Sequence, residues 1–510
     1  MKWKAISRRK FLALASIGAA GTYVEWHAGI AKAMMGGGGM GCGPMVGGGI
    51  SIINPPVGNI FPDLPEATKN SDGVFEITAQ EAQVKLNGTT ATLLTYNGSF
   101  PGPVIRAGKG ETLKLNFKNS LPATDSLNFL GHQRNITNIH THGLHVSPKE
   151  PADAMMIMLK PGQSYSYVYD LSKEEPGHLN FYHPHVHGTV AEQYWAGLVG
   201  PLVIKDENAL LSSFETHVMV IKDMTLSGSL PSPYTSTSEY MKGKEGNMVM
   251  VNGEVNPVLS IRPGQIQRWQ LVNACNARFV KLSLEKHSMY LIGTDGGLLD
   301  KPYQQTALLL APGERIDILV KASQIGGSFK LLSLPYDRGC STLQQVTLLT
   351  LSYNGPTAQE VIPGSINPAA ARKKLDTSKL PRRQMTLSMM MGKGYINGQS
   401  FTDMDHCYSV MSQTGSYEIW EIINQSNMDH PFHQHVNSCQ VLSISGGDSA
   451  YASLYTTIPA WKDVVIVPKM GKATLLVPVM DYEGMTMFHC HIIEHEDIGM
   501  MGAWDIMSNM

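Results

Sequence analysis

The amino-acid sequence predicts an all-β protein built from three consecutive β-sandwich domains. From about residue 70 onward, short runs of alternating apolar and polar residues, rich in Val, Ile, Tyr and Thr, are separated by Gly, Pro, Asn and Asp. Period-two alternation between turn signals is typical of sandwich strands, and no long helical periodicity competes with it. The length of 510 residues is enough for about three domains, each with its own core.

A repeated pattern locates the three domains. Each copy has an Asn-Gly turn, a Gly, an alternating strand and a closing Asn, and the copies lie about 150 residues apart. They begin at Asn97-Gly98, Asn252-Gly253 and Asn397-Gly398, and they close at Asn119, Asn273 and Asn424. We therefore expect domains over residues 61–205, 206–354 and 385–510, with the Pro-containing segment 355–384 as a linker.

The composition excludes several classes of protein. Charged residues make up only 16% of the chain and the formal net charge is -2, so no basic field is available to hold nucleic acid. Six Cys cannot be the framework of a disulfide-rich scaffold, although Cys275 and Cys340 are candidates for one pair. Beyond the amino-terminal segment no run approaches the ~20 apolar residues of a membrane span, so no stable membrane insertion is expected.

The amino-terminal segment predicts export. Residues 1–33 contain Ser7-Arg8-Arg9-Lys10-Phe11-Leu12, a short apolar run and the cleavage pattern Ala31-Lys32-Ala33, as in a twin-arginine signal peptide. A membrane anchor is the alternative, but the apolar run is too short. We expect a protein that is periplasmic or otherwise exported by this route. Residues 34–60 are expected to form a Gly/Met-rich flexible segment; collection of soft Cu(I) by its Met residues and Cys42 is the second reading.

Most of the His residues fall in four short windows. These are His140-Thr141-His142, His183-Pro184-His185-Val186-His187, His430-Pro431-Phe432-His433-Gln434-His435 and His489-Cys490-His491 with His495. On a strand, residues i and i+2 point to the same face, so each H-x-H is a two-imidazole clamp. Two windows lie in the first repeat and two in the last, which predicts a metal site between those two domains.

The types of ligand indicate copper. Two His, a Cys thiolate and a weak Met form a blue-copper electron-transfer site, and His430, Cys490, His495 and Met500 supply that set. His489 and His491 flank Cys490 and point to the opposite face, so they can bind other metal ions that connect to the thiolate through backbone. Zinc is the competing metal, but the chain lacks the C-x-x-C pairs of structural zinc sites.

The motifs HTHG, HPHVHG, HPFHQH and HCHIIEHEDIGMM resemble the four copper-binding signatures of the three-domain multicopper oxidases, which include bacterial laccases and periplasmic cuprous oxidases. The resemblance covers about residues 70–510. It implies three cupredoxin-like Greek-key domains, four copper ions, oxidation of a reductant and reduction of O2 to water. By position, His430, Cys490, His495 and Met500 would bind a mononuclear blue copper. A trinuclear cluster would be held by His140 and His433 on one copper and by His142, His183, His185, His435, His489 and His491 on a coupled pair.

Two acids are candidates for supplying protons to oxygen reduction. Glu496 directly follows His495, at the position where the family has a proton-relay Glu. Asp153 resembles the acid that the family has after the first H-x-H, but Asp-Gly is replaced here by Asp153-Ala154, so a solvated loop acid is the alternative. We expect supporting roles rather than coordination for His145 and His187.

The reductant is the more open question. Met389, Met390, Met391 and Met428 stand where related cuprous oxidases bind Cu(I), and Ser426 replaces an expected Asp. Met155, Met156 and Met158 form a second sulfur-rich group, although Met residues also fill gaps in cores. Residues Met389 and Met428 are therefore candidates for contact with a substrate metal ion.

The family's Met-rich insert is absent between Met391 and Tyr395, which favours a site open to phenols. A non-catalytic copper-binding protein is the alternative of another class. We expect a monomer that uses O2 with Cu(I) or a small phenol.

Overall fold

The computed structural model describes residues 51–53, 57–323, 326–340 and 343–508. The expected signal peptide and most of the Gly/Met-rich segment, including Cys42, lie outside these residues. Within the described part of the chain, no helix is both long and apolar enough to cross a membrane.

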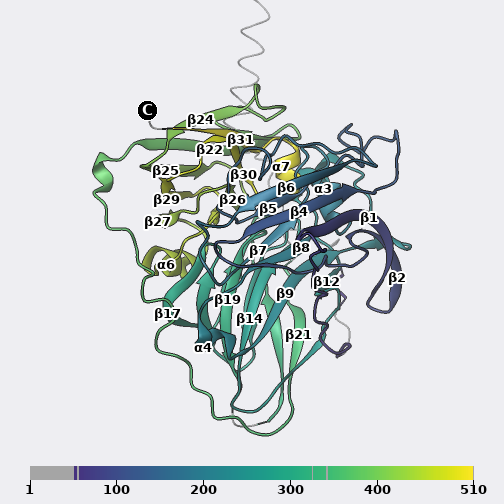
Figure 1. Ribbon diagram of the computed structural model, residues 1–510, viewed down its shortest axis with the longest axis vertical. Helices are drawn as coiled ribbons and strands as arrows, with labels where there is room; N and C mark the ends of the chain where they lie inside the picture. The colour runs from purple at the N-terminus through teal and green to yellow at the C-terminus, as the bar shows by residue number, and fades with distance from the viewer. Residues whose placement is uncertain (1–50, 54–56, 324–325, 341–342, 509–510) are drawn as a thin grey trace, which may run out of the picture. The chain divides into compact units, whose positions relative to one another are not determined.

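The first sandwich has two four-stranded sheets (Figure 1). One sheet has the order β2 (Thr89–Tyr96), β1 (Phe75–Leu86), β4 (Thr112–Asn119) and β6 (Ser164–Asp170). The other has the order β3 (Ile105–Ala107), β8 (Gly200–Ile204), β7 (His178–His183) and β5 (His140–His142). Buried side chains from both sheets, among them Ile77, Leu115 and Ile204, form a common core.

The second sandwich is larger. Its six-stranded sheet has the order β12 (Met248–Val251), β9 (Glu215–Met224), β14 (Ile266–Asn273), β19 (Arg315–Lys321), β16 (Met289–Thr294) and β17 (Gly297–Gln305). Its five-stranded sheet has the order β13 (Val258–Ile261), β21 (Val346–Tyr353), β20 (Ser328–Leu334), β15 (Val280–Leu284) and β18 (Leu308–Leu310). A small hairpin pairs β10 (Leu226–Ser227) with β11 (Leu230–Pro231). Strand β7 of the first sandwich lies against β14 and β19.

The third sandwich has two five-stranded sheets. One has the order β23 (Lys393–Ile396), β22 (Arg382–Met390), β25 (Ser416–Asn424), β29 (Lys472–Val479) and β27 (Gln440–Ser445). The other has the order β24 (Tyr408–Gln413), β31 (Met501–Met507), β30 (Gly484–Cys490), β26 (His430–Gln434) and β28 (Val464–Val467). The prediction of an all-β protein with three sandwiches is confirmed.

The helices are short and lie between the strands. They are α3 (Val190–Trp195), α4 (Ala209–Ser212), α5 (Thr237–Lys242), α6 (Ser449–Thr457), α7 (Ile493–Asp497) and the 3-10 turn η1 (Thr377–Lys379). Helices α3 and α5 both contact α7, which begins three residues after Cys490. The first two sandwiches therefore both reach the segment that carries His495.

The predicted repeat has a structural basis in its turns. Asn97, Asn252 and Asn397 have φ of 54°, 53° and 49°, and the glycines after them also have positive φ. This left-handed conformation is tolerated by Asn and Gly. The side-chain oxygens of the three Asn accept hydrogen bonds from the backbone N–H groups of Thr78, Val220 and Thr386, respectively. One turn therefore anchors the equivalent strands in all three sandwiches.

The closing Asn residues also have one role in common. The side-chain amide of each donates to two backbone carbonyls, such as those of Asn135 and Leu159 for Asn119. Asn273 and Asn424 make the equivalent pairs of hydrogen bonds. Each buried amide therefore satisfies carbonyl groups where a strand ends.

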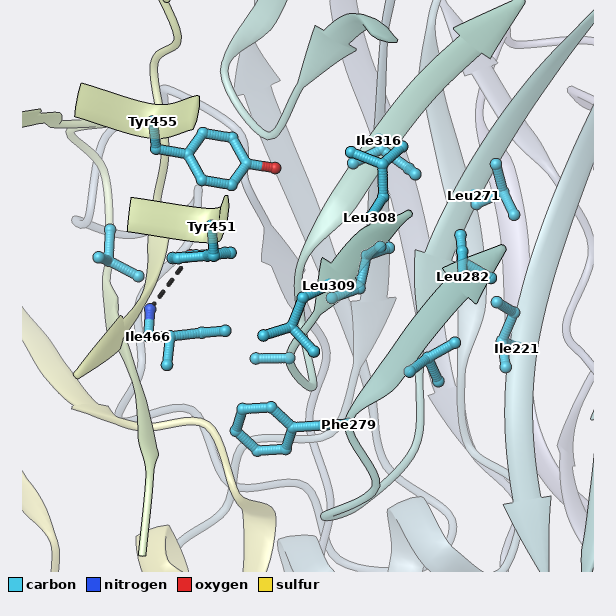
Figure 2. Close-up of a cluster of buried hydrophobic side chains, with 14 of the residues drawn as sticks. Ile221, Leu271, Phe279, Leu282, Leu308, Leu309, Ile316, Tyr451, Tyr455 and Ile466 are labelled. Atoms are coloured by element: carbon cyan, nitrogen blue, oxygen red, sulfur yellow. Dashed lines mark hydrogen bonds between the residues drawn. The ribbon is translucent and has the colours of Figure 1, made fainter. Parts of the chain in front are cut away.

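The cores of the second and third sandwiches are continuous. In Figure 2, Tyr455 of α6 points toward the side where Leu308 and Leu309 of β18 lie, and Tyr451 of α6 is directed at Ile466 of β28; all five belong to one buried cluster. The Tyr451 hydroxyl also accepts a hydrogen bond of 3.2 Å from the backbone N–H of Ile466.

The suggested pairing of Cys275 with Cys340 is wrong, because Cys275 is a free, buried thiol.

Candidate metal centres

One candidate metal centre lies in the third sandwich at the end of β30. The Cys490 Sγ is 3.3 Å from His430 Nδ1 and 3.5 Å from His495 Nδ1, and the two Nδ1 atoms are 3.2 Å apart. All three side chains are buried, and their donor atoms converge on one small volume.

The outer nitrogen of each histidine has its own partner. His430 Nε2 lies 2.7 Å from the Ser426 hydroxyl oxygen, and His495 Nε2 lies 3.3 Å from the backbone carbonyl oxygen of Met241 in α5. Such contacts orient a ring so that its other nitrogen faces the metal. Both histidines therefore present Nδ1 to the thiol sulfur.

Met500 is held close to this centre by backbone hydrogen bonds. Its N–H donates to the carbonyl of His495 and its carbonyl accepts from the N–H of Cys490. The side chain is buried in the same cluster as Cys490. A Cβ at Gly394 would lie 2.7 Å from the Met500 Cβ, so only glycine leaves room for Met500 here.

A second candidate centre lies where the first and third sandwiches meet. Eight buried imidazoles gather there: His140, His142, His183, His185, His433, His435, His489 and His491. His489 Nε2 lies 3.2 Å from His185 Nε2 and 3.1 Å from His435 Nε2. The ring of His491 lies 5.6 Å from that of His183, centroid to centroid.

Strand register explains why the clamps face one another. In the first sandwich β5 pairs antiparallel with β7, so that His140 is opposite His183. In the third, β26 pairs antiparallel with β30, so that His433 is opposite His489. Directly opposed residues share a face of the sheet, and each clamp thus becomes half of a four-imidazole group.

Burial keeps these histidines neutral. Loss of water lowers the pKa of His140, His142, His433, His435 and His491 well below the usual value, and nearby imidazoles lower it further. The same effect lowers the pKa of His183 and His489 to about 3. A neutral imidazole keeps a lone pair for a metal ion.

Three family models match this chain in succession. Each is described as multicopper oxidase, and they cover residues 78–209, 215–356 and 372–509. The chain belongs to the multicopper oxidase family. It is therefore a copper-dependent oxidoreductase with oxygen as the acceptor, and its three sandwiches are cupredoxin domains.

Individual relatives agree with this assignment. The chain is 30% identical to a multicopper oxidase of Staphylococcus haemolyticus, over 87% of this chain and 91% of the relative. It is 27% identical to a laccase of Bacillus subtilis, over 85% and 94% of the two chains. Among solved structures, one described as a multicopper oxidase from Campylobacter jejuni, a metallo-oxidase, has a TM-score of 0.76 and 27% identity, covering 90% of this chain and 98% of that one.

The donor atoms of this multicopper oxidase fit copper. Among the described residues, the buried nitrogens His140 Nε2, His142 Nδ1, His183 Nε2 and His433 Nε2 and both ring nitrogens of His491 have no hydrogen-bond partner. An unsatisfied buried polar atom costs about 1–3 kcal/mol, so the gathering of several such nitrogens in one place indicates a bound ligand. Imidazole nitrogens, together with one thiol and a thioether in the other centre, form a donor set that suits copper.

Both candidate acids of the multicopper oxidase lie beside the eight-histidine group. Asp153 Oδ2 is 2.7 Å from His140 Nδ1, and its other oxygen accepts a hydrogen bond from the Thr141 N–H. Glu496 Oε2 is 3.3 Å from His489 Nδ1, and Oε1 is 3.6 Å from His185 Nδ1. Burial raises the pKa of Asp153 to about 7 and that of Glu496 well above its usual value. Neither acid is a solvated loop residue.

The Met residues fall into two groups. Met428 is buried, its backbone carbonyl accepts a hydrogen bond from the Ser426 hydroxyl that also contacts His430, and its sulfur accepts a hydrogen bond of 3.8 Å from Arg338. Met389 is partly buried against the core cluster that contains Cys490. Met390 and Met391 are exposed at the turn between β22 and β23. In the other sulfur-rich group, Met155 is buried with Met487 and Met501, whereas Met156 and Met158 are exposed.

The remaining histidines support other residues. His145 joins the first and third sandwiches, with Nδ1 2.8 Å from the Val436 carbonyl oxygen and Nε2 2.8 Å from Asp481 Oδ1. The His187 ring meets those of His132 and Phe401 edge to face. Within the described part of the chain, neither His145 nor His187 belongs to a group of metal-binding side chains that includes any of the eight gathered imidazoles.

Sequence reasoning missed several residues that contact or adjoin the two centres. Asp463 Oδ1 lies 3.2 Å from His142 Nε2. Asp497, the neighbour of Glu496, does not touch a candidate ligand in the described part of the chain but accepts hydrogen bonds from the backbone N–H groups of Gly188 and Ala191, and Gly188 ends the second histidine motif. Met241 acts through a backbone oxygen, which no side-chain pattern signals. Asp497 does carry a signal, since it follows Glu496 directly in the most specific of the four motifs.

Proposed function

We propose that this multicopper oxidase couples one-electron oxidation of a small reductant, Cu(I) or another metal ion, to the four-electron reduction of O2 to water, and that it serves copper tolerance. The observation that carries the proposal is the group of unpartnered imidazole nitrogens between the first and third sandwiches, joined through one strand to a Cys-His-His centre.

We assign the metal ligands as four copper ions require. His430, Cys490, His495 and Met500 would hold one copper, and the eight gathered imidazoles would hold three, with His140 and His433 on the single copper of that cluster. Bound copper supplies the one-electron redox chemistry. Strand β30 ends at Cys490, which faces one centre, whereas its neighbours His489 in the strand and His491 directly after it face the other, so the two centres are linked by a short covalent path.

We assign proton handling to the two buried acids. Glu496 lies between His185 and His489, where its carboxyl group can hold a proton and release it toward the space that the eight histidines enclose. The Asp153 carboxylate accepts from His140 Nδ1 and thereby turns Nε2 inward. Asp153 thus both orients a ligand and offers a second proton site.

The surroundings of His495 favour a small reductant. His430 and His495 are fully buried, and α5 places the Met241 carbonyl against the outer nitrogen of His495. The missing insert favours an opening for bulky phenols. At His495, however, helix α5 of the second sandwich covers the ring and closes that opening. Met389 and Met428 stay the candidates for contact with a metal ion because thioether sulfur is a soft donor, and the Met428 carbonyl accepts a hydrogen bond from the Ser426 hydroxyl that contacts His430. The similarity to a structure described as a metallo-oxidase supports the same substrate class.

Oxygen uptake by the copper-loaded protein tests this function. We expect uptake with Cu(I), and slower uptake with a bulky phenol. A phenol rate that is indifferent to added Cu(II), with no Cu(I) oxidation, would exclude the metallo-oxidase and leave a laccase. Copper binding without any oxygen uptake would instead show a non-catalytic copper-binding protein.

We further propose that the chain is exported through the twin-arginine route, because Arg8-Arg9 precedes an apolar run and an A-x-A site. Replacement of both arginines by Lys should retain the precursor in the cytoplasm, as fractionation and immunoblotting would detect. An unchanged distribution would reject this route.

A further inference from the structure

A buried arginine of the second sandwich reaches the boundary of the eight-histidine group. The Arg315 guanidinium, only 1% exposed, donates from Nη1 and Nη2 to the two oxygens of Asp463 at 2.5 and 2.6 Å. Its Nε donates to the Leu179 carbonyl and Nη2 donates to Asn180 Oδ1, both in β7 of the first sandwich. Arg315 thus contacts residues of all three sandwiches.

Asp463 in turn contacts two of the candidate copper ligands. Its Oδ1 lies 3.2 Å from His142 Nε2, and its backbone carbonyl accepts a 2.9 Å hydrogen bond from His433 Nδ1. The opposite nitrogens, His142 Nδ1 and His433 Nε2, have no partner in the described part of the chain. One residue therefore holds the outer edges of two rings and turns their free edges toward the same space.

The first H-x-H motif is built to admit Arg315. Gly143, directly after His142, has φ of 100°, and a Cβ at this position would lie 2.2 Å from Arg315 Nη2. Gly313, two residues before Arg315, is equally constrained, because a Cβ there would lie 2.8 Å from His491 Nδ1. The loop of the second sandwich thus packs directly against the histidine group at two points.

The ion pair continues into a larger buried network. Lys462 lies 2.9 Å from Asp295 Oδ2 and 2.7 Å from Glu314 Oε1, and the Tyr451 hydroxyl donates to Glu314. Tyr451 also belongs to the buried cluster that the second and third sandwiches share (Figure 2). With Arg315 and Asp463, the network has two cations and three carboxylates, an excess of one negative charge when all are ionised. Removing Arg315 would leave a buried carboxylate unpaired beside His142.

We propose that Arg315 is a positioning residue for the copper cluster: the second sandwich, which contributes none of the eight gathered imidazoles, sets the orientation of His142 and His433 through Arg315 and Asp463. The physical basis is that a metal-bound histidine is oriented by the partner of its other nitrogen, and loss of such a partner typically costs about 10- to 100-fold in metal affinity or activity. The inference rests on the proposed copper cluster, but it does not depend on which reductant is used.

The variants separate positioning from general loss of a buried ion pair. Arg315→Lys keeps the charge but loses the planar fork, whereas Arg315→Met loses both. The matched control is Arg268→Met, because Arg268 makes an equally buried pair with Asp317 and contacts Gly177 of the first sandwich but touches none of the eight histidines. Asp463→Asn keeps the shape of the Asp463 side chain and removes its charge.

The readouts are copper per chain, the electron paramagnetic resonance spectrum of the cluster copper, and the absorption of the Cys490 copper. Under limiting copper, we expect Arg315→Met to lower cluster affinity about 10- to 100-fold and to alter the resonance spectrum, with unchanged blue absorption. Arg315→Lys and Asp463→Asn should show smaller changes in the same direction. Arg268→Met should lower the melting temperature alone.

Wild-type copper content and an unaltered resonance spectrum in Arg315→Lys and Asp463→Asn would overturn the inference, even if Arg315→Met does not fold. An equal alteration in Arg268→Met would also overturn it, since that result would reflect loosened sandwiches. These spectra need no turnover. Wild-type protein that loads four coppers without consuming oxygen would therefore reject the proposed function and leave the positioning test intact.

Discussion

The imidazole ring of His142 stacks on that of His433, with 3.8 Å between centroids and 12° between planes. The first ring comes from the first sandwich and the second from the third. The eight-histidine group is therefore not a property of either sandwich alone, and its metal affinity and the docking of the two sandwiches are thermodynamically linked.

Copper removal should destabilise the protein. A ligand that binds only the folded state at about 1,000 times its Kd adds about 4 kcal/mol of stability. We expect the copper-free protein to melt several degrees below the loaded one by scanning calorimetry, with recovery after reloading. Equal melting temperatures for the two forms would contradict linkage between the centre and the docked sandwiches.

Cys490→Ser should abolish the intense blue absorption, which arises from copper–thiolate bonding, and retain copper at the eight-histidine group. Visible absorption and metal analysis would check both outcomes. Cys439→Ser is the matched control, since Cys439 is also a free, buried thiol of the third sandwich but has no contact with either candidate centre. Retention of the blue colour in Cys490→Ser would remove Cys490 from the site.

Glu496→Gln should slow oxygen reduction about 100-fold, the lower range for loss of a general acid, while electron uptake by the Cys490 copper stays unchanged. Glutamine preserves the size of the side chain but cannot release a carboxylic proton. Anaerobic reduction followed by mixing with O2 would measure the two steps separately. As the control, Glu483→Gln changes an exposed glutamate and should leave both rates unchanged. If O2 reoxidises Glu496→Gln at the wild-type rate, the proton role of Glu496 is refuted.

The pair His145–Asp481 should make stability depend on pH in the copper-free protein. The hydrogen bond from His145 lowers the pKa of Asp481 to about 2, and although burial acts in the other direction, Asp481 raises the pKa of His145. The His145 contribution is complete below its unfolded pKa of about 6.5 and is lost as pH rises through the folded value. The Asp481 contribution is present above about pH 4 and is lost toward pH 2.

Asp481→Asn should therefore cost most between about pH 4 and 6.5, by about 0.2–1 kcal/mol because both side chains are partly exposed. Denaturant unfolding at several pH values would measure this difference. Asp481 also pairs with Lys173, so Lys173→Met serves as the control and should show no change in stability with pH in the range where His titrates. A constant penalty for Asp481→Asn from pH 5 to about 8 would exclude the assignment to His145.

Loosening α5 should widen the range of reductants. Ser236 caps this helix in a capping box with Glu239, and loss of such a cap costs about 1 kcal/mol. We expect Ser236→Ala to raise kcat/KM for a bulky phenol several-fold and to leave the rate with Cu(I) unchanged. Asn208→Ala removes the cap of α4, which is remote from His495, and should change neither rate. Identical phenol kinetics in both variants would show that α5 does not limit access.

The histidine positions could be predicted because the strand period of two is local. The spacing of His140 and His142, or of His489 and His491, already places each pair on one face, whatever the rest of the fold. The Asn-Gly turns were equally local, since positive φ is required at Asn97 itself. Asp153 was less certain from sequence, because its place beside His140 depends on the path of the loop between them.

Arg315 and Asp463 could not be predicted in this way. Neither lies near a His motif in the sequence, and their pairing depends on the docking of the second sandwich against the third. Ser426 was noticed only as the replacement of an expected acid, yet its hydroxyl contacts His430 Nε2. Long-range contacts and backbone atoms leave no periodic pattern in a single sequence.

The contact of His495 with the Met241 carbonyl has a consequence for how access to the Cys490 centre can evolve. Every amino acid carries the same carbonyl, so substitution of Met241 alone leaves the acceptor oxygen in place. A broader substrate range must instead arise from changes that shift or shorten α5, and such changes lie in its cap and its flanking loops. Natural variation in substrate choice at this position should therefore be found in the helix cap and in insertions and deletions around residues 232–246 rather than in substitutions of Met241 itself.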